Sequence, residues 1–578
     1  MSDDDLLINE DEIGETVPEL PNKKTCDRKK VIISVVIITI IVLIGAIVTS
    51  VIFLLRKPGS NNEQNKGENK ELEYEIETVK FDSNIIYIGS HYNYQGDVLL
   101  IYKKQLSNNY FVGIADEKGK LIKEVYEIKD GEVDDTYIHR ASSFSDGKRV
   151  LIGGKILQCT YELKYCDDAK LYDVEFPEQL RNLPTLLYLF TEPIINYGGK
   201  YIFWSTFDTS MNIFNFFGEL IFTGEKYVIE NAKGLTNYFY DLYNKETGTY
   251  TLPKILRFGP IKQVIEGGKA LSIGGFLNYG LRKGIYQSLS DNQINQITFF
   301  EGYDETTSIS PDQKLACIMT TRFSNKTSFE IIGLIPTPYS ILASYLVSID
   351  VMSFSIGALR KKEIVKGNLG PALVYLNKEK EEKNYKGINL KTDDLWIFNG
   401  FFSWSPDGTK VMFDETLKTK DNKRCQIVRL KNYQPSEIKI KDNFNPKVPY
   451  ARTIEETLNM HLDYPININI PGKSGNLQIL HEENKCELTY DNFSEDNEIF
   501  YNGKYIYEKV NENGVTNSVY TVNIKSEGKK KGNCEFRLWF DDKSMLSFEQ
   551  YTNGKNKSYG SCNYEGKVIN VDIYKYDL

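Results

Sequence analysis

Serine catalysis is the first chemistry to test, because a hydrolytic serine must be held in a particular turn. A Gly-x-Ser-x-Gly motif between a strand and a helix supplies that turn in many hydrolases. Gly560-Ser561-Cys562 resembles the start of the motif but lacks the second glycine. No helical pattern follows it. The sequence therefore argues against a serine hydrolase.

Metal chemistry has little support in the pattern of ligands. Zinc sites use closely spaced histidines or cysteines, as in His-Glu-x-x-His. The four histidines are dispersed along the chain, at His91, His139, His461 and His481. We therefore expect no metal and no cofactor.

Carboxylates offer the remaining catalytic possibility. A glycosidase uses two carboxyl groups that lie roughly 5–9 Å apart, a separation that sequence spacing cannot reveal. The acidic pairs Glu455-Glu456 and Glu482-Glu483 are typical of solvated surface loops. A glycosidase-like hydrolase that draws two carboxylates from separate structural repeats lining a central channel is thus the alternative to a protein without catalytic activity.

A membrane segment governs where any such chemistry would take place. Residues Val31 to Leu55 are uncharged and mostly apolar. As a helix this segment would be roughly 37 Å long, enough to cross a hydrocarbon core of about 30 Å. Five Lys and Arg residues precede it within residues 23–30 and two follow it closely. This bias predicts a single-pass type II protein with a cytosolic amino terminus.

The parts on either side of this segment differ in composition. Residues 1–30 form an acidic tail that we expect to be disordered, and 56–72 form a polar, flexible stalk. Residues 73–578 remain for an ectodomain outside the cytosol. In the tail, Asp3, Leu7 and Ile8 match the acidic dileucine pattern, for which clathrin adaptors would be the partner.

Short turn motifs recur through the ectodomain and predict its fold. The motifs pair a turn residue with a following Lys and an apolar strand, and their anchors are Gly147, Gly199, Gly268, Gln313, Gly408 and Gly503. Asp146, Asp312 and Asp407 precede three of them. Turns of this kind join the strands of hairpins. The first intervals are near 50 residues and the last two about twice that, which predicts four-stranded blades with two diverged members.

One motif also carries a family resemblance. Ser405-Pro406-Asp407-Gly408-Thr409-Lys410, preceded by Trp404, resembles the repeat of TolB-like and Trp-Asp-repeat-like β-propellers. Ser310 to Lys314 resembles it with Gln313 in place of glycine. The resemblance implies an all-β ectodomain with seven or eight blades.

Cysteines and glycosylation motifs agree with an ectodomain outside the cytosol. Cys159 and Cys166 are spaced for a hairpin, and Cys534 and Cys562 flank a strand-turn-strand stretch, so both pairs are disulfide candidates. The Asn-x-Ser/Thr motifs lie at Asn325, Asn492 and Asn556.

These features predict a binding protein rather than an enzyme. The net charge of −9 argues against a nucleic-acid partner, which would need clustered Lys and Arg. We expect a non-catalytic receptor, anchored in the bilayer of the plasma membrane or the endosomal and lysosomal system. Its propeller would bind a protein, peptide or glycan. The membrane-tethered hydrolase with glycosidase-like carboxylates is the alternative.

Overall fold

A computed structural model of the chain describes most of the residues beyond position 71. The described residues are 72–571 without 134–137, 139–140, 183–185, 188–192, 209–212, 236–242, 245–248, 251–255, 278–280, 324–329, 345, 348–349, 351–368, 383–384, 394, 418–421, 437–441, 460–465 and 543–553. The predicted tail, the membrane segment and residues 56–71 therefore lie outside them. Among the residues that are described, no helix has the length and apolar character needed to cross a membrane.

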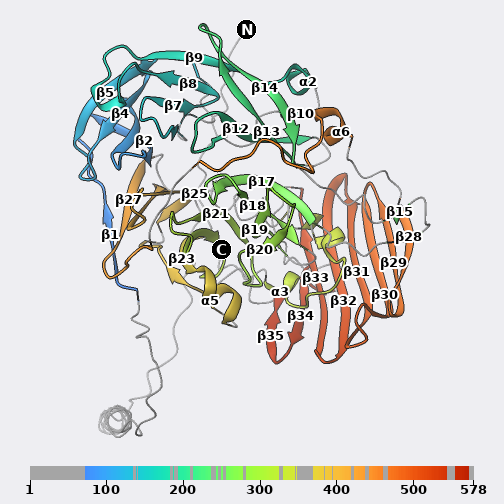
Figure 1. Cartoon of the computed structure of the whole chain (residues 1–578). Coiled ribbons are helices and arrows are strands. Elements are labelled where there is room, and N and C mark those ends of the chain that lie inside the picture. Colours follow the sequence, from blue (N-terminus) through green and yellow to red (C-terminus); the bar gives the residue numbers. More distant parts are fainter. Residues whose placement is uncertain are drawn as a thin grey trace, which may run out of the picture. The chain divides into compact units, whose positions relative to one another are not determined.

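Six groups of antiparallel strands follow one another along the chain (Figure 1), and we call them blades. The second and third blades are also joined by a short parallel pairing between their last strands. The first blade consists of β2 (Ile85–Tyr92), β3 (Val98–Lys104), β4 (Tyr110–Ala115) and β5 (Leu121–Ile128). The second consists of β6 (Ala141–Ser143), β7 (Arg149–Ile152), β8 (Lys155–Gln158) and β9 (Lys170–Glu175). The third consists of β10 (Leu186–Leu187), β11 (Ile194–Ile195), β12 (Tyr201–Asp208), β13 (Ile213–Phe222) and β14 (Tyr227–Gly234). In the third blade, β10 and β11 both pair with β12 and share the place of the first strand.

The next three blades have the same order of strands. The fourth blade consists of β17 (Leu256–Ile265), β18 (Ala270–Leu277), β19 (Lys283–Ser288) and β20 (Ile294–Gln296). The fifth consists of β21 (Asp304–Ile309), β22 (Leu315–Thr320), β23 (Gly370–Tyr375) and β24 (Ile388–Asn389). The sixth contains β25 (Trp396–Trp404), β26 (Lys410–Leu417) and β27 (Lys423–Leu430). The sixth blade takes its fourth strand from the other end of the described chain, as β1 (Tyr74–Thr78).

This fourth strand closes a ring of blades. All five residues of β1 pair antiparallel with β27, from Leu430 to Gln426. A buried apolar cluster lies between each blade and the next, and another lies between the sixth and the first, where Met412 and Tyr87 both contribute. Each blade is thus packed on both faces against a neighbour. Such a closed ring of four-stranded sheets is a β-propeller.

The first strands of the blades lie nearest the axis of the ring. β2 lies beside β6 and β25, and β21 lies beside β17 and β25. Between the strands of the blades, the described residues also form a small hairpin, β15 (Tyr243–Asn244) with β16 (Thr249–Tyr250), and short helices: η1 (Leu163–Tyr165), α2 (Glu178–Arg181), α3 (Glu330–Gly333) and α5 (Leu376–Glu381).

The described residues form six blades, not the seven or eight that the sequence predicts. Between Gln313 and Gly408 the described residues form no diverged blade; an insertion separates β22 from β23 within the fifth blade instead. The next interval, from Gly408 to Gly503, leaves the ring after β27. Turn spacing alone does not distinguish an insertion from a diverged repeat, so the predicted number of blades exceeds the number that the described residues form.

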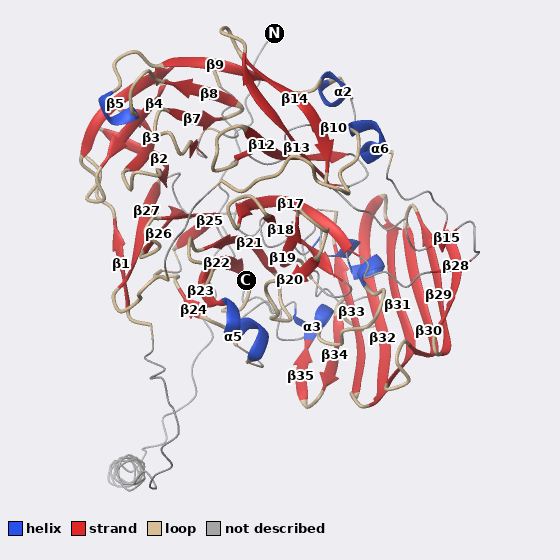
Figure 2. Ribbon diagram, viewed as in Figure 1, coloured by secondary structure: helices blue, strands red, loops and turns tan. Residues whose placement is uncertain are grey.

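A separate sheet of eight strands follows the ring (Figure 2). It is an antiparallel meander of β28 (Ile466–Pro471), β29 (Ser474–Glu482), β30 (Lys485–Ser494), β31 (Ile499–Glu512), β32 (Val515–Gly528), β33 (Gly532–Phe540), β34 (Tyr559–Tyr564) and β35 (Lys567–Asn570). Buried Leu477 and Ile479 alternate with exposed Asn476 and Gln478. That alternation is typical of a sheet with one packed and one solvated face. Residues 466–570 therefore do not continue the propeller, contrary to the expected propeller over 73–578.

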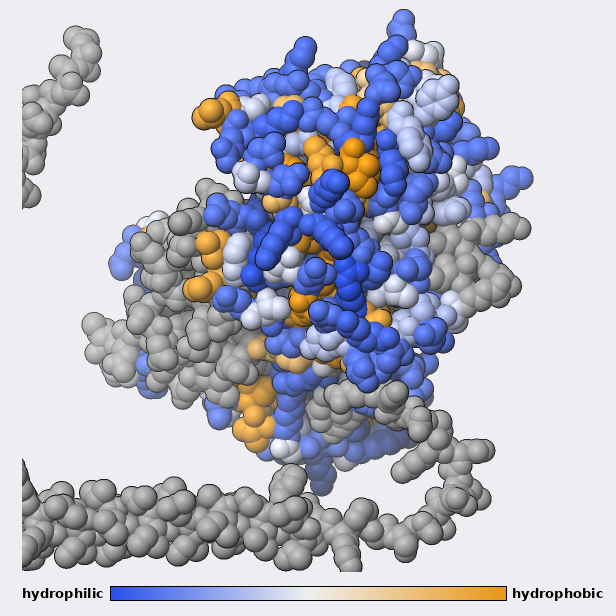
Figure 3. Space-filling view, turned by 90° about the vertical axis from the view of Figure 1, so that its left-hand side faces the viewer, coloured by the Kyte–Doolittle hydropathy of each residue, from blue (hydrophilic) through white to orange (hydrophobic). Residues whose placement is uncertain are grey.

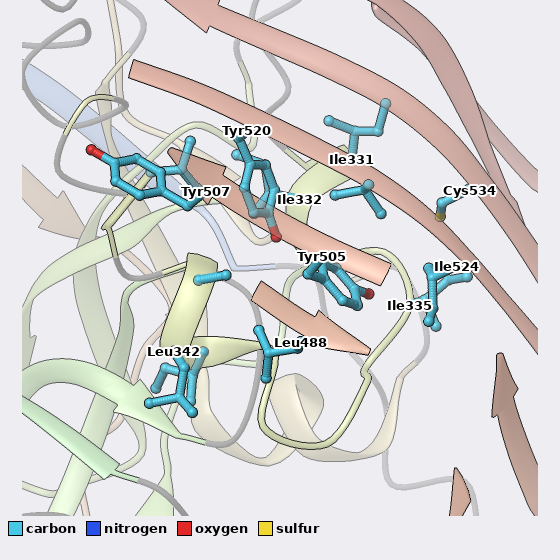
Figure 4. Close-up of a cluster of buried hydrophobic side chains, with 14 of the residues drawn as sticks. Ile331, Ile332, Ile335, Leu342, Leu488, Tyr505, Tyr507, Tyr520, Ile524 and Cys534 are labelled. Atoms are coloured by element: carbon cyan, nitrogen blue, oxygen red, sulfur yellow. The ribbon is translucent and has the colours of Figure 1, made fainter. Parts of the chain in front are cut away.

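The packed face of this sheet covers the insertion of the fifth blade (Figure 4). Ile331 and Ile335 of the insertion share a buried cluster with Leu488 of β30. The hydroxyl groups of Thr337 in the insertion and Tyr505 in β31 lie 2.7 Å apart and share a hydrogen bond. The insertion thus ties the eight-stranded sheet to the ring.

The sequence predicts that Gly503 lies at a blade turn, but the structure places it inside β31. Its φ of +118° lies in the region that favours glycine, and a Cβ at this position would be 2.1 Å from the carbonyl oxygen of Asn523. The strand pairs on both sides there, with Tyr490 and Ile524. The glycine therefore permits close approach of a neighbouring strand rather than a reversal of the chain.

Replacement of this glycine tests the assignment. We expect Gly503→Ala to lower the free energy of unfolding by about 3 kcal/mol, from backbone strain and from the contact with Asn523. Gly514→Ala is the matched control, because Gly514 also has a positive φ but has nothing within 4 Å of the added Cβ. It should cost about 1 kcal/mol. Equal losses in urea unfolding would contradict the tight packing at Gly503.

Candidate binding surface

One end of the ring carries the turns between the first and second strand of each blade, and we call it the turn face. Neighbouring turns contact one another there. The Ser145 hydroxyl in the second blade donates to the Tyr197 carbonyl in the third, and the Gln95 side chain of the first lies against Gly147. The turn face is therefore a continuous surface and not a set of separate hairpins.

The predicted turn aspartates shape these turns. Asp146 accepts hydrogen bonds from the backbone N–H of Lys148 at 2.8 Å and Asp407 from that of Thr409 at 3.0 Å. Gly147 and Gly408 both have φ near +69°, and Gln313 takes the same left-handed conformation at +61°. These interactions are local and satisfy the turn backbone. They give the aspartates a structural role.

A strap crosses part of the turn face. We use this name for residues 431–459, which follow β27 and include α6 (Ile454–Leu458). The Tyr433 hydroxyl and the Ser436 backbone N–H of the strap donate to Asp312 Oδ2 of the fifth blade, at 2.5 and 3.2 Å. Asp312 is thus more than a turn residue, because it also holds the strap.

The strap then passes over the fourth and third blades. The Asn443 backbone N–H donates to the Gly267 carbonyl at 2.7 Å. The ring of Phe444 lies 4.7 Å from that of Tyr201, centroid to centroid, and the Asn196 amide donates to Asp442 at 3.0 Å. In the part of the strap that the structure describes, these contacts go to the third, fourth and fifth blades. At its start, the Lys431 N–H also donates to the Glu73 carbonyl beside β1 of the sixth blade, at 2.8 Å.

A short disulfide loop stands on the turn face at the second blade. Cys159 and Cys166 are joined, with their Cα atoms 5.8 Å apart, and the loop between them presents Tyr161 and Tyr165, each 67% exposed. Leu163, between the two tyrosines, is buried. The disulfide and the buried leucine hold both aromatic side chains toward solvent.

Hydrogen bonds fix this loop to the neighbouring turns. The Leu163 N–H donates to the Gly147 carbonyl at 2.9 Å, and Lys164 forms a 3.1 Å salt bridge with Asp97 in the first blade. At the carboxyl end, Asp168 accepts from the backbone N–H of Thr160 at 3.2 Å. The loop is therefore held in one conformation by contacts on each side.

A third tyrosine extends the surface toward the first blade. Tyr94 is 37% exposed and its ring meets that of Tyr197 edge to face at 5.2 Å. Burial, with a smaller contribution from Tyr197, raises the pKa of Tyr94 to about 12, so its hydroxyl remains a neutral donor. We call Tyr94, Tyr161 and Tyr165 the tyrosine surface. Tyrosine combines apolar area with a polar hydroxyl and few rotatable bonds, which suits it to protein interfaces.

The hydrolytic alternative can be tested on the buried carboxyl groups of β21, a strand near the axis of the ring. Glu305 pairs with Arg282 at 2.6 Å and with Lys262 at 3.1 Å. Burial opposes its ionisation, but the two cations overcome burial and lower the pKa of Glu305 to about 2. A general acid needs a raised pKa. Glu305 thus suits an ion pair better than proton donation.

Its neighbour on β21 belongs to a second group of charges. Arg322 lies 2.8 Å from Asp304 and also pairs with Glu379 of α5, and all three side chains are fully buried. Arg322 stands at the start of the insertion. The group therefore fixes the insertion to both the first strand and the helix of the fifth blade.

Replacement of Arg322 tests how much the stability of the protein depends on the cation in this buried group. We expect Arg322→Met to lower the free energy of unfolding by about 3–5 kcal/mol, because two buried carboxylates lose their cation. Arg429→Met is the control: that arginine pairs with Glu117 at 2.6 Å but is partly exposed, and its loss should cost about 1 kcal/mol or less. Urea unfolding measures both.

A triple variant checks the physical reason. Arg322→Met combined with Asp304→Asn and Glu379→Gln removes the charges together, and should recover most of the stability that the single variant loses. If the triple variant is as unstable as Arg322→Met, packing and not uncompensated charge explains the loss.

The remaining sequence-predicted residues lie apart from this surface. Cys534 and Cys562 face each other on β33 and β34 and form the second disulfide. Asn492 is exposed on β30, whereas Asn556 is half-buried. Asn325 lies outside the described residues, as do the tail residues Asp3, Leu7 and Ile8. Asp168 lies close to Cys159 and Cys166, but the two sulfur atoms are joined to each other.

Sequence reasoning identified the disulfide of the turn face but not the tyrosines within it. The available signal was the presence of two aromatic residues inside a short cysteine-bounded loop. The Asp304, Arg322 and Glu379 group had no such signal, since its members come from separate elements that only the folded chain brings together.

Comparison with known proteins adds little to this picture. No family model matches the chain, and no curated protein is similar to it. A solved protein assigned as a TolB from Agrobacterium tumefaciens is similar at 11% identity over 57% of this chain and 92% of its own, with a TM-score of 0.29. TolB from Acinetobacter baumannii is similar at 14% identity over 62% of this chain and 65% of its own, with a TM-score of 0.28. At these scores the propeller assignment rests on the sheets and clusters described above.

Proposed function

We propose that this protein is a non-catalytic receptor whose propeller binds a protein partner through the tyrosine surface. The observation that carries the proposal is the pair of exposed tyrosines on a loop fixed by a disulfide and a buried leucine. Large aromatic side chains held rigidly in solvent favour binding, because little conformational entropy is lost when a partner covers them.

The position of the strap favours this part of the turn face. Its described contacts lie over the third, fourth and fifth blades and, through Lys431, on β1 of the sixth, whereas the tyrosines belong to the first and second. A partner can therefore approach the tyrosine surface without displacing the strap. Figure 3 shows the side of the molecule with the first and sixth blades: the surface is mostly hydrophilic, with separate apolar patches.

The proposal includes a membrane anchor and a location outside the cytosol. Residues 31–55 would cross the bilayer and the stalk would carry the propeller away from it. Two disulfides support an oxidising compartment, which is where such bonds persist. Either the plasma membrane or the endosomal and lysosomal system would satisfy this, with clathrin adaptors reading the tail.

The hydrolytic alternative has weaker support among the described residues. It needs one carboxyl group that stays protonated near neutral pH beside a second, ionised one. On β21, next to the axis, both acids are paired with cations instead. Hydrolysis of a glycoside by the full-length protein would support the hydrolytic alternative.

Loss of the tyrosines tests the binding surface. We expect Tyr161→Ser combined with Tyr165→Ser to weaken a partner's affinity about 30-fold or more, since interface tyrosines contribute ~1–2 kcal/mol each. Partners are first identified by crosslinking the full-length protein in its membrane, and the affinity of the purified partner is then measured. Tyr559→Ser is the control, because Tyr559 is also exposed but lies on the eight-stranded sheet.

The two variants separate the outcomes. Equal affinities for the double variant and the wild type would refute the tyrosine surface. Equal losses in the double variant and in Tyr559→Ser would indicate a different interface that includes the eight-stranded sheet.

Glycosylation tests the side of the membrane. Asn492 is exposed on β30, so in cells it should carry a glycan that peptide N-glycosidase removes with a shift in electrophoretic mobility. Asn492→Gln should remove the shift from that site, and Ser494→Ala should do the same while keeping the asparagine. A chain with no sensitive glycan at any of its three motifs would contradict the proposed topology.

A further inference from the structure

A buried carboxyl group lies in the seam between the sixth and the first blade, where the ring closes. Asp414 of β26 is 9% exposed, and the hydroxyl of Tyr87 on β2 donates a hydrogen bond to its carboxylate. Ser90, also on β2, has its hydroxyl 2.7 Å from that of Tyr87 and 3.3 Å from the sulfur of Cys425. Side chains from the first blade thus close over an acid of the sixth.

Asp414 differs from the other buried acids of the ring. Glu415, the next residue, pairs with Arg424 at 2.7 Å, whereas the side chains that contact Asp414 are uncharged hydroxyl groups. The charge that acts on it is that of Lys423, whose ammonium group donates to a backbone carbonyl of β2 at 3.2 Å.

The other titratable groups in the seam do not compete with Asp414 for a proton near neutral pH. Burial raises the pKa of Tyr87 and also that of the Cys425 thiol, and the carboxylate of Asp414 adds to both shifts. Both groups therefore stay neutral. Asp414 is the group in this seam whose charge changes in that range.

We propose that Asp414 is a pH-sensitive latch: while its carboxyl group is protonated, the buried seam between the sixth and the first blade holds no uncompensated negative charge there, and its ionisation loosens the seam. The direction follows from linkage. Burial raises the pKa of Asp414 to about 7, above the value of about 3.9 expected in the unfolded chain. The folded chain binds this proton more tightly, so the stabilisation is complete in acid and is lost as the pH rises through 7.

The test compares the full-length protein in detergent micelles with Asp414→Asn. The amide keeps the shape of the protonated acid but does not ionise. Between pH 5.5 and 7, the folding equilibrium constant of the wild type should fall, relative to that of the variant, by up to about tenfold per pH unit. At pH 8 the variant should be the more stable protein. Parallel pH profiles for the two proteins would overturn the proposal.

Asp407→Asn is the matched control on the same blade. Partial burial would raise the pKa of Asp407, but hydrogen bonds from Ser405 and Thr409 hold it below its usual range. That variant should change stability without changing the profile above pH 6. Burial lowers the pKa of His91 to about 4, and its titration is common to all these proteins, so it cancels in the comparison.

Infrared spectroscopy keeps the proposal testable if Asp414→Asn does not fold. The wild type should show the carbonyl band of a protonated buried acid at pH 6 and lose it by pH 8.5. Tyr87→Phe removes a hydrogen bond that favours the ionised form, so it should move the loss of the band to higher pH. A wild type without this band at pH 6 would overturn the latch. None of these measurements depends on a partner, so they stand or fall separately from the tyrosine surface.

Discussion

The five residue pairs between β1 and β27 join the two ends of the ring, and the packing of every blade depends on that join. Each apolar cluster of the propeller lies between two blades, so no blade completes its core alone. A ring that failed to close would expose one face of the first blade and one of the sixth. Because the joining strand comes from the start of the described residues, the propeller cannot be complete until both ends of the ring have formed. This makes its folding a long-range process.

Two additions to the ring depend on its closure. The strap follows β27 and is held by turns of three blades, so its path is defined once those turns share a face. The insertion leaves the fifth blade between β22 and β23, and the buried group around Arg322 fixes its start. The eight-stranded sheet then packs on the insertion through contacts such as that between Tyr505 and Thr337. The buried charges around Arg322 select one arrangement of the insertion, which apolar packing alone would not do.

Sequence reasoning succeeded where the determining interactions are local. Asp146 and Gly147 form a turn with their immediate neighbours, and Cys159 pairs with a cysteine seven residues away, so both could be predicted. The number of blades depends on how segments far apart pair, and Gly503 shows the consequence. Its surroundings read as a turn, yet a 14-residue strand passes through it because neighbouring strands pair on both sides. To predict the tyrosine surface, one would have to know which part of the turn face the strap leaves uncovered.

The charge pairs of β21 and the exposed tyrosines together support the proposed binding role over the hydrolytic alternative. Catalysis by carboxylates requires two acids with different pKa values and room for a substrate between them. On β21, cations neutralise the acids and hold the blade together. Tyr161 and Tyr165, in contrast, contribute nothing to the core, because the loop is already anchored by its disulfide and by Leu163. A fold can hold large side chains in place without using them for its own packing, and such side chains are available to a partner. In this propeller they lie on the turn face, where contacts between neighbouring turns already fix the blades.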